Sequence, residues 1–104
     1  MKDLLLLETR IAEVLKEVYD PEIPVNIYDL GLIYNVAVDH NHSATITMTL
    51  TAPNCPMADF ILLQVKESVE AIEGVKSVDI KLVFDPPWSK NMMSEEAMLE
   101  LGLL

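Results

Sequence analysis

Residues 44–51 read Ala-Thr-Ile-Thr-Met-Thr-Leu-Thr, an uninterrupted alternation of apolar side chains and threonines. A period of two places the apolar residues on one face of a β-strand and the threonines on the other. We therefore expect a strand with one buried face and one wetter face. Residues 51–56, Thr-Ala-Pro-Asn-Cys-Pro, follow directly and hold the single cysteine of the chain, Cys55.

Two elements are expected before this strand. Residues 4–18 repeat apolar side chains every three or four positions, which predicts an amphipathic helix with one core-facing stripe. Pro21 should end that helix near Tyr19, because the residue before a proline avoids helical geometry. Residues 40–43 are polar and should form a hairpin connection. An earlier strand is expected over residues 32–39, with one face formed by Leu32, Tyr34, Val36 and Val38.

A helix and a third strand are expected after it. Pro56 suits the first turn of a helix, where its missing N–H costs no hydrogen bond, and Gly74 suits the C-terminal end. The apolar stripe of this helix would be Met57, Ile61, Leu62, Val65, Val69 and Ile72. The strand is expected over residues 75–84, with one apolar face formed by Val78, Ile80, Leu82 and Phe84.

A short helix completes the pattern. Ser94 should cap its first turn, Met93 and Met98 are spaced as a hydrophobic staple, and Gly102 should end it. The order of elements is then α-β-β-α-β-α. This predicts a two-layer α+β domain with the helices on one face of a three-stranded mixed sheet, and residues 1–104 should form a single domain. The strand order stays open, but if the third strand lies beside the second, their connection should be right-handed.

Composition excludes several classes of protein. Seventeen acidic residues against seven basic ones give a formal charge of −10, which disfavours binding to nucleic acid or to an anionic membrane surface. One cysteine rules out an intramolecular disulfide framework. The apolar run at residues 4–7 is too short for a signal peptide, and no stretch approaches the roughly 20 residues of a membrane span. We expect a cytoplasmic protein.

Cys55 is the leading functional candidate. The pattern places it at the N-cap of the middle helix, where free N–H groups and the helix dipole stabilise a thiolate and so lower the pKa of the thiol. The nearby acidic loop acts in the opposite direction, so the net shift of this pKa stays open. A thiolate binds soft metals or attacks electrophiles. The alternative is a buried cysteine that only fills space, which is common for this residue type.

An acidic loop precedes the first expected strand. Asp20, Glu22 and Asp29 lie around Pro21 and Pro24. Their carboxylates would serve as hard-metal ligands, as general bases, or as hydrogen-bond acceptors that organise the loop; the last is the commonest use of Asp in such turns. Their spacing matches no metal-binding signature.

Two further groups have weaker signals. His40 and His42 in the hairpin would bind a metal only weakly, and a solvated turn explains them as well. Trp88 and the methionines at 92, 93 and 98 form an adaptable apolar segment. It would either be a docking surface or fold back over the sheet edge or Cys55.

Three motifs in order resemble one family. Residues 20–34, residues 51–57, and residues 85–88 followed by 93–97 resemble the opening, cysteine and closing signatures of SufT- and PaaD-like proteins, the metal–sulfur cluster biosynthetic group. The resemblance covers nearly the whole chain. It implies an accessory role in assembling iron–sulfur clusters or delivering them to client proteins, and the α+β fold of cluster-assembly domains.

By that resemblance Cys55 is the functional cysteine and the metal ligand. Asp20, Asp29, Thr51 and Pro56 are implied as motif positions around it. The chain ends at Leu104 without the cysteine-bearing extension of some PaaD-like relatives, which favours the general assembly role.

One cysteine cannot hold a cluster alone, because a cluster generally takes four ligands, mostly thiolates. A homodimer contributing two copies of Cys55, completed by small thiols or by a scaffold or client apoprotein, would hold one transiently. Equally, Cys55 would mark a docking surface that never touches iron. The resemblance thus implies either a shared, transient cluster or no cofactor.

Two rival functions remain open. A thiol enzyme would need a general base near Cys55. The histidines sit at the opposite end of the second strand, roughly 25 Å away at about 3.3 Å per residue, which argues against an enzyme. The other rival is an interaction module without cluster contact, with the Trp/Met segment as its interface.

Overall fold

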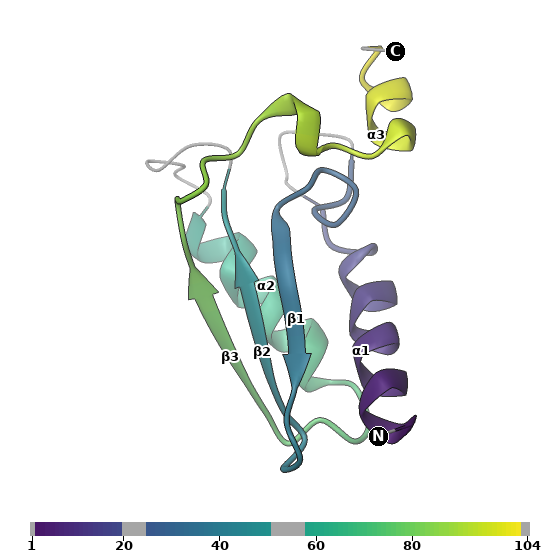
Figure 1. The fold of residues 1–104 in the computed structure, drawn as a ribbon, viewed down its shortest axis with the longest axis vertical. Helices are drawn as coiled ribbons and strands as arrows, with labels where there is room; N and C mark the ends of the chain where they lie inside the picture. The colour runs from purple at the N-terminus through teal and green to yellow at the C-terminus, as the bar shows by residue number, and fades with distance from the viewer. Residues whose placement is uncertain (1, 20–24, 51–57, 103–104) are drawn as a thin grey trace.

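A computed structural model of the chain describes residues 2–19, 25–50 and 58–102, and the element order is α-β-β-α-β-α, as expected. Figure 1 shows the arrangement. The elements are α1 (Lys2–Leu15), β1 (Ile33–Val38), β2 (Ser43–Met48), α2 (Ala58–Glu70), β3 (Ser77–Leu82), the short 3-10 helix η1 (Lys90–Met92) and α3 (Glu95–Glu100). Within these described residues, no helix has both the length and the apolar character needed to cross a membrane.

The three strands form one mixed sheet with β2 in the centre. β1 runs antiparallel to β2, and β3 runs parallel to it with Ser43 beside Ser77 and Met48 beside Leu82. The strand order left open by the sequence is therefore β1-β2-β3. In Figure 1 the chain leaves β2, passes behind the sheet through α2 and returns to β3 in the same direction, which is the expected right-handed crossover.

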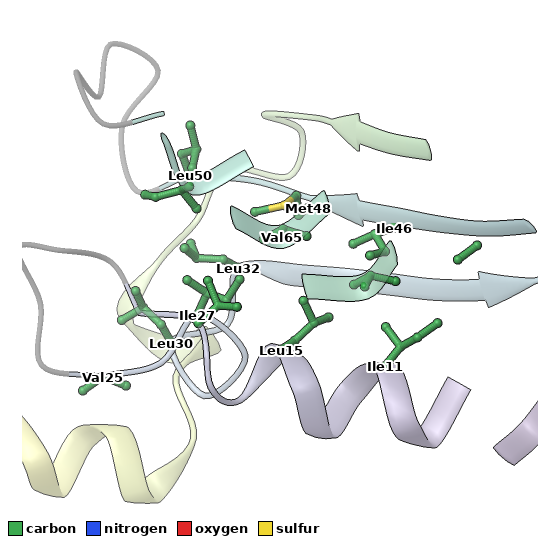
Figure 2. Close-up of a cluster of buried hydrophobic side chains, with 14 of the residues drawn as sticks. Ile11, Leu15, Val25, Ile27, Leu30, Leu32, Ile46, Met48, Leu50 and Val65 are labelled. Atoms are coloured by element: carbon green, nitrogen blue, oxygen red, sulfur yellow. The ribbon is translucent and has the colours of Figure 1, made fainter. Parts of the chain in front are cut away.

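The core lies between the sheet and two helices. Ile11 and Leu15 of α1 and Val65 of α2 point toward Ile46 and Met48 of β2 (Figure 2), and all five side chains are completely buried. The expected helical stripes are confirmed at their central residues, Ile11, Leu15, Val18, Ile61, Val65 and Val69, which are buried. Val14, expected on the first stripe, lies outside the core cluster. The alternation along β2 is confirmed for its apolar face, since residues 44, 46, 48 and 50 are all buried.

Several expected details are wrong at the ends of elements. Helix α1 stops at Leu15 rather than near Tyr19, because the next turn tightens: Glu17 N–H donates to Val14 O and Val18 N–H donates to Leu15 O. Val18 nevertheless stays buried. β2 ends at Met48, and Thr49, expected on the wetter face, is fully buried.

Two strand faces also depart from strict alternation. The β1–β2 register shifts between Ile33 and Asn35, so that Ile33 packs on the core as well as Val36. In β3, Val78 and Ile80 are half-buried as expected. Leu82 and Phe84 are 38% and 40% exposed, because β3 lies at the edge of the sheet, where neighbouring elements cover it incompletely.

Helix α3 lies beyond the end of the sheet (Figure 1), so the expectation that helices cover one face holds for α1 and α2 only. Its cap is as expected: Ser94 Oγ accepts a hydrogen bond from Ala97 N–H at 3.1 Å. Met93 is buried and Met98 packs against the core, as a staple requires.

Candidate functional site

Only one of the predicted site residues lies in the part of the chain that the structure describes. Cys55, Thr51, Pro56 and Asp20 lie outside the described residues, as does Glu22. Asp29 lies inside them. Described residues lie on either side of residues 20–24 and 51–57. The surroundings of the candidate site can therefore be built from these flanking residues.

Three chain segments meet at the end of the sheet where β2 stops. Thr49 N–H donates to Leu32 O at 2.8 Å, which joins the end of β2 to the start of β1. Val83 N–H donates to Met48 O at 2.9 Å, which joins the end of β3 to the same place. Figure 2 shows Leu30, Leu32 and Leu50 gathered here. Residues that flank each of the three family signatures therefore lie together, at the end to which Leu50 leads.

The ends of the acidic loop are clamped together. Tyr19 and Asn26 form an isolated antiparallel bridge, and Ile27 N–H donates to Val18 O at 2.8 Å. The two described flanks of residues 20–24 thus run side by side. This clamp sets where the loop leaves and re-enters the fold.

Asp29 organises the turn that follows. Its carboxylate accepts from Asn26 Nδ2 at 2.8 Å, and its own N–H donates to Asn26 Oδ1 at 2.8 Å. Its backbone carbonyl accepts from Ser94 N–H, also at 2.8 Å. Of the three uses considered for this carboxylate, hydrogen bonding that orders the loop is the one these contacts support. Its place among the functional residues stays a prediction.

The closing signature docks on the opening one. Trp88 Nε1–H donates to Leu30 O at 2.8 Å, and Tyr34 Oη–H donates to Pro86 O at 2.7 Å. Gly31 has a φ of +89°, and a Cβ there would collide with the backbone of Met92. The Trp/Met segment therefore folds back onto residues 30–31 and onto Tyr34 at the start of the edge strand β1.

A groove of about 580 Å³ opens beside this junction. Its walls come from the clamp and from α3, and it is lined by Tyr19, Val25, Asn26, Asp29, Glu96, Ala97, Leu99 and Glu100. Three of these residues are carboxylates, and they lie on two different elements. No local pattern predicts that Glu96 and Glu100 line this groove, because the pairing of α3 with residues 25–29 is long-range.

The histidines lie at the opposite end of the sheet. His40 and His42 occupy the β1–β2 hairpin, where Asp39 Oδ1 accepts from the N–H groups of Asn41 and Ser43. Six residues of β2 separate this turn from Thr49 and Leu50. Across residues 2–19, 25–50 and 58–102, no three His, Cys, Asp or Glu side chains gather as a metal-binding group.

Comparison with known proteins gives consistent results. A family model described as "iron–sulfur cluster assembly protein" matches residues 8–82. An Fe–S protein maturation auxiliary factor from Porphyromonas gingivalis is 62% identical over 102 residues, covering 98% of this chain and 97% of that protein. The Fe–S protein maturation auxiliary factor SufT from Staphylococcus aureus is 42% identical over 86 residues, covering 83% and 98%.

The fold has a solved counterpart. The crystal structure of a domain of unknown function from Bacillus anthracis superposes with a TM-score of 0.93 at 38% sequence identity, covering 99% of this chain and 98% of that one. At this similarity the two chains share the same α+β fold.

Proposed function

The chain belongs to the iron–sulfur cluster assembly protein family, and from this we infer that it is an accessory factor in assembling iron–sulfur clusters or delivering them to client proteins. The resemblance to SufT-like proteins in the sequence analysis agrees with this membership. The relatives are named as auxiliary maturation factors rather than as enzymes. We extend that to a non-enzymatic, cytoplasmic role.

Cys55 is the proposed point of action, with Thr51, Pro56, Asp20 and Asp29 around it. The supporting observation is the convergence of the flanks of all three signatures on one end of the sheet. Helix α2 is described from Ala58 onward. The sequence predicts that Cys55 lies at the start of this helix, where free N–H groups would favour its thiolate.

The cluster is the cargo of this site, not a resident group. One thiol supplies one of the four ligands that a cluster generally takes, so a second molecule must complete the set. That molecule is a scaffold protein, a client apoprotein or another copy of the chain. A histidine-assisted thiol enzyme is disfavoured, because the hairpin that holds His40 and His42 lies at the other end of β2 from Leu50.

Anaerobic reconstitution with iron and sulfide tests the proposal. With a small thiol present to supply the remaining ligands, we expect visible absorbance typical of a thiolate-bound cluster with the wild-type chain and its loss with Cys55→Ser. His40→Ala is the matched control, since it changes an exposed side chain at the far end of the sheet and should keep the absorbance. In cells, Cys55→Ser should lower the activity of cluster-dependent enzymes while the protein stays folded.

A role as an interaction module without cluster contact makes the opposite prediction. Cys55→Ser would then leave client activities unchanged. Deleting residues 88–102 is a poor test of that alternative, because Trp88 and Ser94 hold residues 29–30 in place and the deletion would disturb the fold itself.

A further inference from the structure

The two edges of the sheet are protected differently. At the β1 edge, Glu8 of α1 reaches the strand, and its carboxylate accepts from Val38 N–H at 3.4 Å. At the β3 edge, no strand in the described part of the chain pairs with residues 77–82 on the side away from β2. An edge of this kind presents backbone groups that another strand can bind.

The direction of those backbone groups follows from the parallel ladder. Val83 N–H donates to Met48 O, so the odd-numbered residues of β3 face β2. The even-numbered residues Val78, Ile80 and Leu82 therefore turn their N–H and C=O groups to the free edge. Asp79 and Lys81 alternate with them, and both side chains are exposed.

We propose that β3 is a self-pairing edge: two copies of the chain join antiparallel through residues 77–82, about a two-fold axis at Ile80. Ile80 then lies opposite itself, and Val78 lies opposite Leu82 of the other copy. These three pairs exchange the outward backbone hydrogen bonds. Asp79 lies opposite Lys81 of the other copy in the closer, non-hydrogen-bonded pairs, where side chains interact most strongly.

Charge selects this register. Moving the axis to Asp79 would place that carboxylate directly opposite itself, and moving it to Lys81 would do the same with the ammonium groups. Like charges directly opposite each other destabilise an antiparallel pair. A lysine on an edge strand commonly prevents pairing; here Asp79 offers it an opposite charge in one register.

Local charge also permits self-association at this edge. The chain as a whole carries −10, so two copies repel each other in general. Residues 76–82 contain Lys76, Lys81 and Asp79 as their charged residues, a local sum of +1. The β3 edge is therefore free of the acidic excess found elsewhere.

Apolar side chains beside the edge would be covered by the second copy. Leu63 of α2 is 56% exposed and Leu82 is 38% exposed. A groove of about 360 Å³ runs between α2 and β3 and is lined by Leu62, Leu63, Lys66, Val78, Asp79 and Ile80. The even-numbered side chains of the other copy would project on this helix side, next to the groove.

Pairing of this kind would separate the two sites. Leu50 lies two residues beyond Met48, level with residue 84 of β3, and residue 84 lies opposite residue 76 in the dimer. The two Leu50 residues would be displaced by roughly 25 Å along the strands, at about 3.3 Å per residue. This dimer therefore keeps apart the two Leu50 residues that precede the cysteine-bearing segments, whether or not the proposed function holds. The pairing itself does not depend on that function.

Sedimentation equilibrium over a wide concentration range tests the interface. The wild-type chain should approach twice the monomer mass. Asp79→Lys and Lys81→Asp each create two like-charge pairs, and each should weaken association by about tenfold or more. The double variant Asp79→Lys/Lys81→Asp exchanges the charges and should restore the dimer. Glu17→Lys makes the same change in net charge as Asp79→Lys, at an exposed position just after α1, and should keep wild-type association.

Mixing the two single variants gives the most discriminating test of the charge pairing. The Asp79→Lys chain carries a lysine at both facing positions, and the Lys81→Asp chain carries an aspartate at both. Each lysine of one chain would then face an aspartate of the other, so the mixture should dimerise where neither variant does alone. Circular dichroism checks that each variant is folded. A wild-type chain that stays monomeric throughout, or a dimer that Asp79→Lys leaves intact, would overturn the proposal.

Discussion

The two ends of the sheet are held by different kinds of contact. At the end where β2 stops, bonds join residues far apart in sequence: Trp88 to Leu30, Ser94 to Asp29 and Thr49 to Leu32. At the hairpin end, the side chain of Asp39 bonds N–H groups only two and four residues away. One end is a junction of three segments. The other is a turn ordered by its own Asp39 and joined to one further segment, the start of β3, where Lys76 N–H donates to His42 O at 2.9 Å and Ser77 Oγ–H donates to Ser43 Oγ at 2.8 Å.

This difference indicates where the molecule requires accurate geometry. A long-range junction orders several segments at once, at a considerable cost in conformational entropy, and it loses them together when one contact fails. A turn ordered mainly by one of its own side chains can change with less effect on other segments. The family signatures lie at or beside the junction, so substitutions there should affect both stability and cluster maturation.

The largest effect is expected at Gly31. Its φ of +89° disfavours any side chain, and an added Cβ would overlap the Met92 backbone. Gly31→Ala should lower the free energy of unfolding by roughly 3 kcal/mol. Chemical denaturation measures it. Gly102→Ala is the matched control: its φ is +73° but nothing lies within 4 Å of the added Cβ, so about 1 kcal/mol is expected from backbone strain alone.

Equal losses for the two glycine variants would show that the collision with Met92 is relieved at no cost, and that the closing segment is loosely held. A larger loss for Gly31→Ala should be accompanied by lower client-enzyme activity in cells, because residues 85–93 would shift.

A smaller difference is expected between two aspartate-centred turns. Asn26→Ala removes two hydrogen bonds to the half-buried Asp29 and should cost about 1–2 kcal/mol. Asp39→Ala removes two bonds in the exposed hairpin and should cost about 0.5 kcal/mol. Thermal unfolding of the two variants side by side gives the comparison. If Asp39→Ala lowers the stability more than Asn26→Ala does, the hairpin end does not tolerate substitution better than the junction.

Sequence patterns predicted the elements because each pattern is local. The threonine alternation placed β2, the apolar spacing placed α1 and α2, and Ser94 with its staple placed α3. The shift between Ile33 and Asn35 and the tightened turn after Leu15 followed from no local signal. Both depend on how the chain packs at the junction.

The candidate site was predictable in part for the same reason. Asp29 beside an asparagine three residues earlier is a local turn, and its hydrogen-bonding role was among the uses considered. The docking of Trp88 on Leu30 spans 58 residues, and the collision that adds to the positive φ at Gly31 comes from the distant Met92. Family resemblance located the three signatures, but only the fold shows that their described flanks hold one another.

The smallest effect is expected at His42. Its φ of 63° lies in the left-handed region, which glycine adopts without a steric penalty, while glycine also gains entropy in the unfolded chain. These terms oppose each other, so His42→Gly should change the free energy of unfolding by no more than about 0.5 kcal/mol. Client-enzyme activity in cells should equal that of the wild type, because the hairpin and the junction lie at opposite ends of β2. A clear loss of activity with stability unchanged would assign the hairpin a role in cluster maturation. The junction would then not be the only end of the sheet at which substitutions affect maturation.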